Sequence, residues 1–306
     1  MNGITPTTIL IALVLLLFFW FACGQVTENW LSHRGALQEE VALHAGGVDV
    51  FIPEGNRGDG LAYSGALRML SSMGISYVSF RNPSTPPHAH TTLIMMGGEG
   101  FSNHGNVKLN SFSDLLEDPL YERYIILPTT FATSQPHVRT FLRRMPINAV
   151  VFCRDRKNAD EVEKIASCKV RTDHDTSLSA DLGRFKRLGK GRVCAFRDRS
   201  GAPVTLGPAR KRNFATMGNG KDNDWENYVR EIANYSEIHT DDPHVATAAA
   251  KLGKRTYVYA NPRSGSRGVY LHSLSSMHNT RLVNPKSDDK LIWKYLGIAY
   301  VTSLDD

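Results

Sequence analysis

A repeated alternation of short apolar strands with amphipathic helices is the feature that most constrains how this chain can fold. Beyond position 46, short segments rich in Val, Ile and Leu alternate with segments of helical periodicity. Apolar strands separated by helices are typical of parallel sheets, so we expect an α/β fold. The predicted strands cover residues 48–52, 75–80, 91–96, 124–127, 148–153, 169–171, 193–197, 237–240 and 255–260, and the predicted helices cover 61–73, 135–144, 157–166, 224–233, 289–299 and a segment that begins at 243.

Glycine or polar residues follow directly after several of the predicted strands. Asn56, Gly58 and Asp59 follow the first strand, and Gly97 and Gly98 follow the third. Glycine allows backbone N–H groups to approach a ligand closely. Because ligands bind at the carboxyl ends of parallel strands, we expect these clusters to converge on one edge of a sheet.

The helix that begins at Pro243 carries the strongest candidate for chemistry. Asp242 suits the N-cap and Pro243 the first helical position, which places His244 in the first turn. The unpaired N–H groups and the dipole of that turn favour a bound phosphate or carboxylate, to which an imidazole can add a donor. A histidine that only packs at the helix start fits the same position.

The N-terminus reads as a membrane anchor. Residues 4–24 contain no charged side chain, and their apolar core approaches the roughly 20 residues that cross a bilayer. No Lys or Arg precedes this core, which favours an uncleaved signal anchor over a cleaved signal peptide. We expect a transmembrane helix at 1–24 and a stem at 25–46, and therefore a single-pass membrane protein of a Golgi-like secretory compartment or of a bacterial inner membrane.

Composition limits the possible ligands. The net charge of +6 favours an anionic ligand, but the Lys and Arg residues are scattered and no nucleic-acid-binding signature is present, so we expect no nucleic acid partner. The four cysteines show no CxxC spacing, and we expect no structural metal.

The ordered set of strand-end motifs resembles the polysaccharide pyruvyl transferases over nearly the whole chain after the stem. Residues 240–244 resemble the family's Thr-Asp-Arg-Leu-His signature, and residues 261–274 resemble the segment around Lys-x-Arg-x-Val-Tyr that follows it. The other matching segments are 55–59 for an Asn-x-Gly-Asp loop, 97–100 for a Gly-Gly-Gly loop, 126–129 for Leu-Pro-Gln-Thr, 152–155 for an Arg-Glu pair and 174–175 for His-Asp.

This resemblance implies a fold and a reaction. The family's fold is two Rossmann-like domains that face a cleft, as in GT-B glycosyltransferases, here at 47–185 and 186–306. Its donor is phosphoenolpyruvate, which acts as a co-substrate, and no cofactor is needed. The reaction transfers an enolpyruvyl carbon to two hydroxyls of a glycan or polysaccharide acceptor, giving a pyruvate ketal and phosphate.

The resemblance also implies roles for individual residues. His244, Arg154 and His104 would be catalytic, with His244 as an anion ligand or acid. The residues expected to bind substrate are Asn56, Gly58, Asp59, Gly97, Gly98, Asp175, Arg263 and Arg267.

Three positions depart from the family pattern, because the signature Arg is Asp242, the following Leu is Pro243 and the downstream Lys is Gly265. Two cations that would face an anionic donor are therefore missing. The alternatives are a GT-B-like glycosyltransferase that uses a nucleotide sugar and an inactive, membrane-tethered protein that binds glycans. Asp173 and Asp175 could also form the DxD metal site of a nucleotide-sugar transferase, although Asp-rich loops at strand ends are more often turns or caps.

Overall fold

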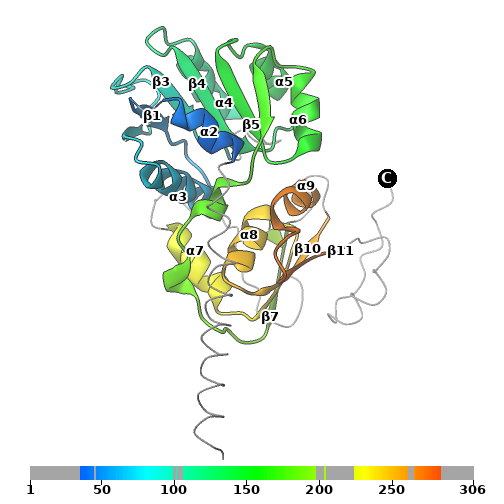
Figure 1. Ribbon diagram of the computed structural model, residues 1–306. Helices are drawn as coiled ribbons and strands as arrows, with labels where there is room; N and C mark the ends of the chain where they lie inside the picture. Colours follow the sequence, from blue (N-terminus) through cyan, green and yellow to red (C-terminus); the bar gives the residue numbers. More distant parts are fainter. Residues whose placement is uncertain are drawn as a thin grey trace, which may run out of the picture.

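The chain forms an α/β fold with two parallel sheets (Figure 1). The computed structural model describes residues 35–44, 46–98, 101, 106–197, 203–204, 224–260 and 265–283. The first sheet has the strand order β2-β1-β3-β4-β5-β6, and the second has the order β11-β10-β9-β7-β8. All strand pairs are parallel except β7 with β8, which is antiparallel.

The first sheet carries helices on both faces. Its strands are β1 (Val48–Phe51), β2 (Tyr77–Phe80), β3 (Thr92–Met95), β4 (Arg123–Thr129), β5 (Ala149–Cys153) and β6 (Lys169–Thr172), and its helices are α2 (Ala36–Ala42), α3 (Arg57–Ser72), α4 (Asn106–Leu116), α5 (Pro136–Arg143) and α6 (Arg156–Glu163). Helices α2 and α3 pack on one face, whereas α4, α5 and α6 pack on the other. The chain changes direction between β1 and β3, so the carboxyl ends of these two strands form the switch point where such sheets bind ligands.

The second sheet is smaller. Its strands are β7 (Arg192–Arg197), β8 (Pro203–Val204), β9 (Glu237–Thr240), β10 (Arg255–Tyr259) and β11 (Thr280–Val283), and its helices are α7 (Asp224–Ala233), α8 (Pro243–Lys251), α9 (Ser266–Val269) and the π-helix η4 (Tyr270–Leu274). Helices α7 and α8 lie together on one side of this sheet (Figure 1). The apolar residues of α7 and α8 and those of β7 and β9 form one core cluster.

The segment that joins the sheets is held between α3 and α8. It contains the 3-10 turns η2 (Thr176–Ser179) and η3 (Gly183–Phe185). The hydroxyl of Thr176 donates to the carbonyl of Ala62 at 2.9 Å, and the Lys251 ammonium donates to the carbonyl of Ala180 at 2.6 Å. A Cβ at Gly65 would lie 1.9 Å from the carbonyl oxygen of Thr176, so only glycine allows this approach. The linker therefore contacts the helices of both sheets.

Most predicted elements match in type, with shifts at their ends. Helix α3 begins at Arg57 instead of 61, because Asn56 and Asp59 form a capping box four residues earlier. Helix α2 lies within the segment expected to be a stem, and its Leu37 and Val41 are buried against the first sheet. Helices α4 and α9, the π-helix η4 and strands β8 and β11 were not predicted.

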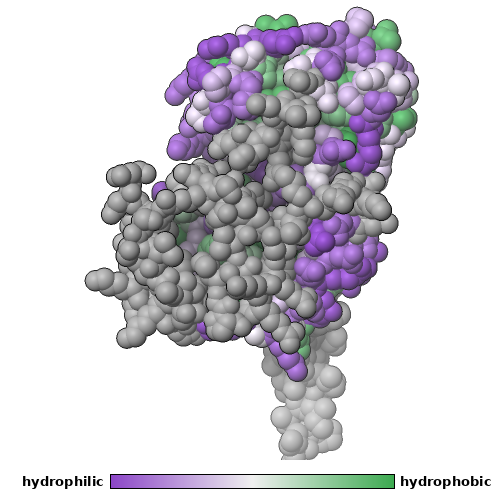
Figure 2. All heavy atoms as spheres, turned by 180° about the vertical axis from the view of Figure 1, so that it is seen from behind, coloured by the Kyte–Doolittle hydropathy of each residue, from purple (hydrophilic) through white to green (hydrophobic). Residues whose placement is uncertain are grey.

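The membrane span stays a prediction. Among the described residues, no helix is long and apolar enough to cross a bilayer. The expected span at 1–24 and the expected C-terminal helix at 289–299 both lie outside those residues. Seen from behind, the surface around the first sheet is mostly hydrophilic with scattered hydrophobic residues (Figure 2).

Candidate functional site

The first turns of α3 and α8 meet at the boundary between the two sheets. A Cβ at Gly58 would lie 2.3 Å from Nδ1 of His244, so the α3 backbone lies directly against the imidazole. Gly58 lies on a helix that packs on the first sheet, and His244 lies on a helix that packs on the second. Two helix N-termini, each with a partial positive charge, therefore face the same region.

Asn56 and Asp59 shape the start of α3. The Asn56 side chain accepts from the Asp59 N–H at 2.9 Å, and the Asp59 carboxylate accepts from the Asn56 N–H at 3.0 Å. Both residues are buried. These hydrogen bonds give Asn56 and Asp59 a structural role as caps, and the backbone of the turn then defines the wall beside His244.

Gly97 and Gly98 bring β3 against its neighbours. A Cβ at Gly98 would lie 2.8 Å from Oδ1 of Asp59, and Gly98 has a φ of +131°, which favours glycine. A Cβ at Gly97 would lie 2.7 Å from Cβ of Thr129. The clusters that follow β1 and β3 are therefore in contact, as the sequence predicted, and the second of them also lies against the last residue of β4.

Arg154 and Asp175 form a buried ion pair at the ends of β5 and β6. Arg154 Nε lies 2.8 Å from Asp175 Oδ2, and its N–H points to the carbonyl of Pro128 at 3.2 Å. The geometry of a hydrogen bond to Oδ2 is not met, so the contact with Asp175 is an ion pair rather than a hydrogen bond. Arg154 and Asp175 are 6% and 1% exposed.

Asp175 stays ionised in this setting. Burial alone would raise the pKa of its carboxyl. The positive charge of Arg154, the nearby His244 and the backbone N–H of Ser177 together hold that pKa below its ordinary value. A buried carboxylate therefore lies beside the candidate imidazole.

His244 is placed for chemistry. Its Nε2 lies 3.9 Å from Asp175 Oδ2, beyond hydrogen-bond distance. Its side chain is 6% exposed, and neither ring nitrogen has a hydrogen-bond partner among the described residues. Buried polar atoms normally have partners, so an imidazole with neither nitrogen paired is unusual and marks His244 as a candidate site residue.

The two positions that lack the family's cations have structural roles. Asp242 is the N-cap of α8 and accepts from the N–H groups of His244 and Val245 at 2.8 and 3.3 Å. Gly265 has a φ of +66° and precedes α9, with Thr130 Cγ2 3.3 Å from the place of a Cβ. A Lys at position 265 would therefore be strained in this backbone conformation.

The other predicted site residues differ in their placement. Arg267 is exposed on α9, next to Gly268, where a Cβ would lie 2.5 Å from Cγ of Asp155. Helix α9 therefore lies against the end of β5, which brings Arg267 near the boundary. His104 and Arg263 lie outside the described residues, so their roles stay predictions.

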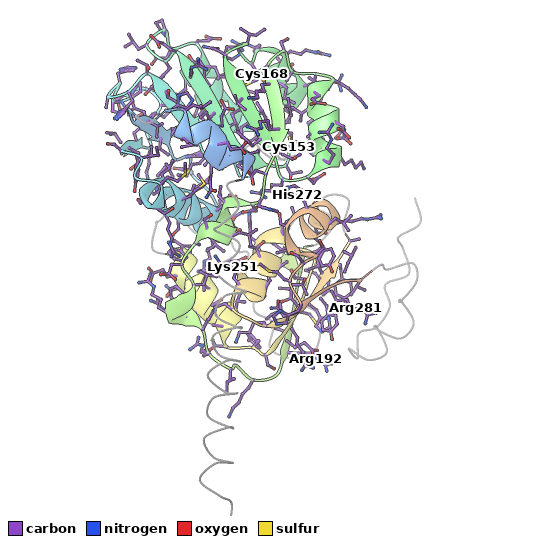
Figure 3. All side chains as sticks on the ribbon, viewed as in Figure 1. Cys153, Cys168, Arg192, Lys251, His272 and Arg281 are labelled. Atoms are coloured by element: carbon purple, nitrogen blue, oxygen red, sulfur yellow. The ribbon has the colours of Figure 1, made fainter. Side chains whose placement is uncertain are left out.

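Sequence reasoning missed a second histidine contact across the boundary. The rings of His174 and His272 have centroids 4.8 Å apart, and His174 Nδ1 lies 3.0 Å from the hydroxyl of Ser273. His272, on η4, lies where the two sheets meet (Figure 3). Burial lowers the pKa of His174, and the nearby His272 lowers it further. No sequence signal marks this contact, because a π-helix has no recognisable pattern of its own.

The DxD interpretation has no support in the geometry. Asp173 accepts from the N–H groups of Leu37 and His174 at 2.5 and 2.6 Å, and Asp175 is paired with Arg154. Within the described part of the chain, no group of three side chains is arranged to hold a metal ion. Asp173 therefore binds backbone N–H groups, and Asp175 is one member of the buried ion pair.

The comparisons with known proteins bear on the fold alone. No family model matches the chain, and no curated protein matches it. A solved structure of a functionally uncharacterised protein from Klebsiella pneumoniae subsp. pneumoniae NTUH-K2044 is similar, with 19% sequence identity and a TM-score of 0.61. The match covers 81% of this chain and 97% of that chain.

Proposed function

We propose that this chain is a glycan pyruvyl transferase with two Rossmann-like, GT-B-like domains and a membrane tether at 1–24. The observation that carries the proposal is the placement of His244. Its imidazole is buried at the first turn of α8, lies against the first turn of α3, and has no hydrogen-bond partner among the described residues. Such a position suits an anionic ligand, and phosphoenolpyruvate carries both a phosphate and a carboxylate.

The chemistry requires few groups. One hydroxyl of the sugar adds to C2 of the enolpyruvyl group as C3 gains a proton. The second hydroxyl then replaces phosphate at C2, which gives the ketal and free phosphate. His244 in its imidazolium form, with a proton on both ring nitrogens, would donate one proton to C3 and become neutral, or would bind the phosphate. Asp175 would hold the imidazole in place through charge, because its ionised carboxylate lies 3.9 Å from Nε2 of His244.

Arg267 is our candidate for the missing cation. It is exposed on α9, and the adjacent Gly268 lies against Asp155 at the end of β5. Arg154 is less suited to bind a donor directly, because its charge is already paired with Asp175 inside the protein. We assign Arg154 to positioning Asp175 and Arg267 to the donor phosphate.

The test is a phosphate-release assay with phosphoenolpyruvate and a panel of β-hexoside acceptors, with and without a metal chelator. We expect release that depends on the acceptor and is unaffected by the chelator. His244→Gln should lower the rate by about 100-fold, within the range for general acid catalysis. His278→Gln, at an exposed histidine, is the matched control and should retain the wild-type rate.

A second candidate is a glycan-binding protein without turnover. The observation that favours it is the excess of buried carboxylates at the boundary between the sheets, where Asp59, Asp155, Asp175 and Asp242 accompany Arg154, the one buried arginine among the described residues. Negative charge there opposes an anionic donor. Binding of an acceptor without phosphate release, together with no thermal shift on addition of phosphoenolpyruvate, would favour this function over transfer.

A further inference from the structure

One face of the second sheet has no described helix packed on it. Val193, Ala195 and Ile238 point towards α7 and α8, and Val258 and Leu282 point towards α8 and η4. The alternate residues of the same strands point to the opposite side. Among the described residues, the buried cluster on that side contains only strand residues, namely Cys194, Phe196, Tyr259 and Val283, with Tyr257 packed against them.

The topology explains this one-sided cover. The chain steps from β7 to β9, then to β10 and then to β11, always in the same direction across the sheet. Crossovers between parallel strands are right-handed, so successive steps in one direction place their helices on one face. Parallel sheets are normally buried on both faces, so the other face needs a segment outside these crossovers.

This second face is ordered in rows of paired residues. In the row nearest the amino ends, Glu237 is paired with Arg192 on one side and with Arg255 on the other. The next row consists of Arg281, Tyr257, His239 and Cys194. Tyr259 and Val283 are paired nearer the carboxyl ends. The face therefore changes from charged to aromatic and aliphatic along the strands.

The charged end of the face is positive. The Glu237 carboxylate forms ion pairs with Arg192 and with Arg255, each at 3.1 Å, and Arg281 adds a further cation. Arg192 and Arg281 both lie at the end of the second sheet away from the first (Figure 3). Among the described residues, this end therefore carries three guanidinium groups and one carboxylate, and an acidic segment would be attracted to it.

We propose that residues 286–306 cover this face, with a helix over its apolar part and the final acidic residues at its arginines. The sequence continues for 23 residues beyond Val283, at the carboxyl end of β11. A helix at 289–299 would be about 16 Å long, roughly the length of a five-residue strand. Its Leu291, Ile292, Tyr295 and Leu296 share one stripe at helical spacing.

The direction of the chain fits the charges. A helix that starts near the carboxyl end of β11 and runs back along the sheet ends near the amino ends of the strands. Asp305 and Asp306 then come close to Arg192, Arg255 and Arg281. The insertion at 198–223 is less suitable, because it carries five Lys and Arg residues against two Asp, whereas 284–306 carries three Lys against four Asp.

Site-specific photocross-linking on the full chain tests this proposal. p-Benzoylphenylalanine is placed at position 257, at the centre of the face, and cross-linked peptides are identified by mass spectrometry. We expect cross-links to peptides within 286–306. Cross-links to 198–223, cross-links to a second copy of the chain, or no cross-link at all would each overturn the proposal. The same label at Val78, an exposed position on β2, is the control and should not link to 286–306.

Cysteine protection provides a second measurement. Cys194 lies on this face and is 6% exposed, whereas Cys153 lies buried in the first sheet. Truncation after Val283 should raise the alkylation rate of Cys194 by about tenfold or more and leave that of Cys153 unchanged. Equal rates for Cys194 in both chains would count against the proposal, and an increase at both cysteines would report unfolding, in which case the cross-links decide.

Discussion

Gly58 and His244 are in direct contact across the boundary between the two sheets. A Cβ at position 58 would lie 2.3 Å from Nδ1 and 2.7 Å from Cγ of the imidazole. The contact joins the first turn of α3 to the first turn of α8, and it fixes the distance between the two helix N-termini. The candidate site therefore depends on the absence of a side chain at position 58.

This contact predicts that Gly58→Ala is harmful to both stability and activity. The added methyl group would push the imidazole away, and overpacking of this kind typically costs about 1–3 kcal/mol. Urea unfolding measures the loss, and phosphate release measures the effect on the site. Gly46→Ala is the control, because nothing lies within 4 Å of its Cβ position. Equal stability of the two variants would contradict the close approach.

The ion pair of Arg154 and Asp175 predicts strong coupling between the two residues. Removal of one partner leaves a buried charge without compensation, which costs about 3–5 kcal/mol. Arg154→Met and Asp175→Asn should therefore each lower the free energy of unfolding, Arg154→Met the more. The double variant Arg154→Met/Asp175→Asn should lose clearly less than the sum of the two single losses. Strict additivity in a double-mutant cycle would show that the pair does not interact.

The cap formed by Asp242 predicts a separation of stability from ligand binding. Asn is as good an N-cap as Asp, so Asp242→Asn should change the free energy of unfolding by less than about 0.5 kcal/mol, whereas Asp242→Ala should cost about 1 kcal/mol. Both variants remove a negative charge beside His244. Calorimetry with phosphoenolpyruvate should then show tighter binding to Asp242→Asn than to the wild type, and weaker binding would argue against an anion site here.

His174 predicts a loss of stability in mild acid. Burial lowers the pKa of His174 in the folded chain below its ordinary value of 6.5, and His272 lowers it further. Between that lowered value and 6.5 the unfolded chain binds the additional proton, so this stability is complete above pH 6.5 and is lost as the pH falls. In His174→Gln the free energy of unfolding should fall less steeply below pH 6.5.

The control for His174 is the exposed His278. His278→Gln should retain the full slope of the wild type. Burial also lowers the pKa values of His44 and His239, so the His174 variant removes only part of the total slope. A slope in His174→Gln identical to that of the wild type would exclude His174 as a contributor.

The sequence by itself determined the α/β class, most strand positions and the start of α8. These features depend on local chemistry, because runs of Val, Ile and Leu indicate buried parallel strands, and Asp242 and Pro243 provide a cap and a first turn that need no distant partner. The sequence also predicted that the glycine clusters after β1 and β3 would meet at one sheet edge. The reason is that parallel strands have their carboxyl ends on the same side.

Only the tertiary structure decided how the chosen residues are used. Arg154 is paired with Asp175, Asn56 and Asp59 are caps, and Gly265 has a backbone conformation that disfavours the expected Lys. The contacts of Gly58 with His244 and of His174 with His272 join residues about 100 or more positions apart, and no local pattern encodes which of them meet. Long-range packing sets those distances, so the chemistry available to His244 follows from the fold as a whole.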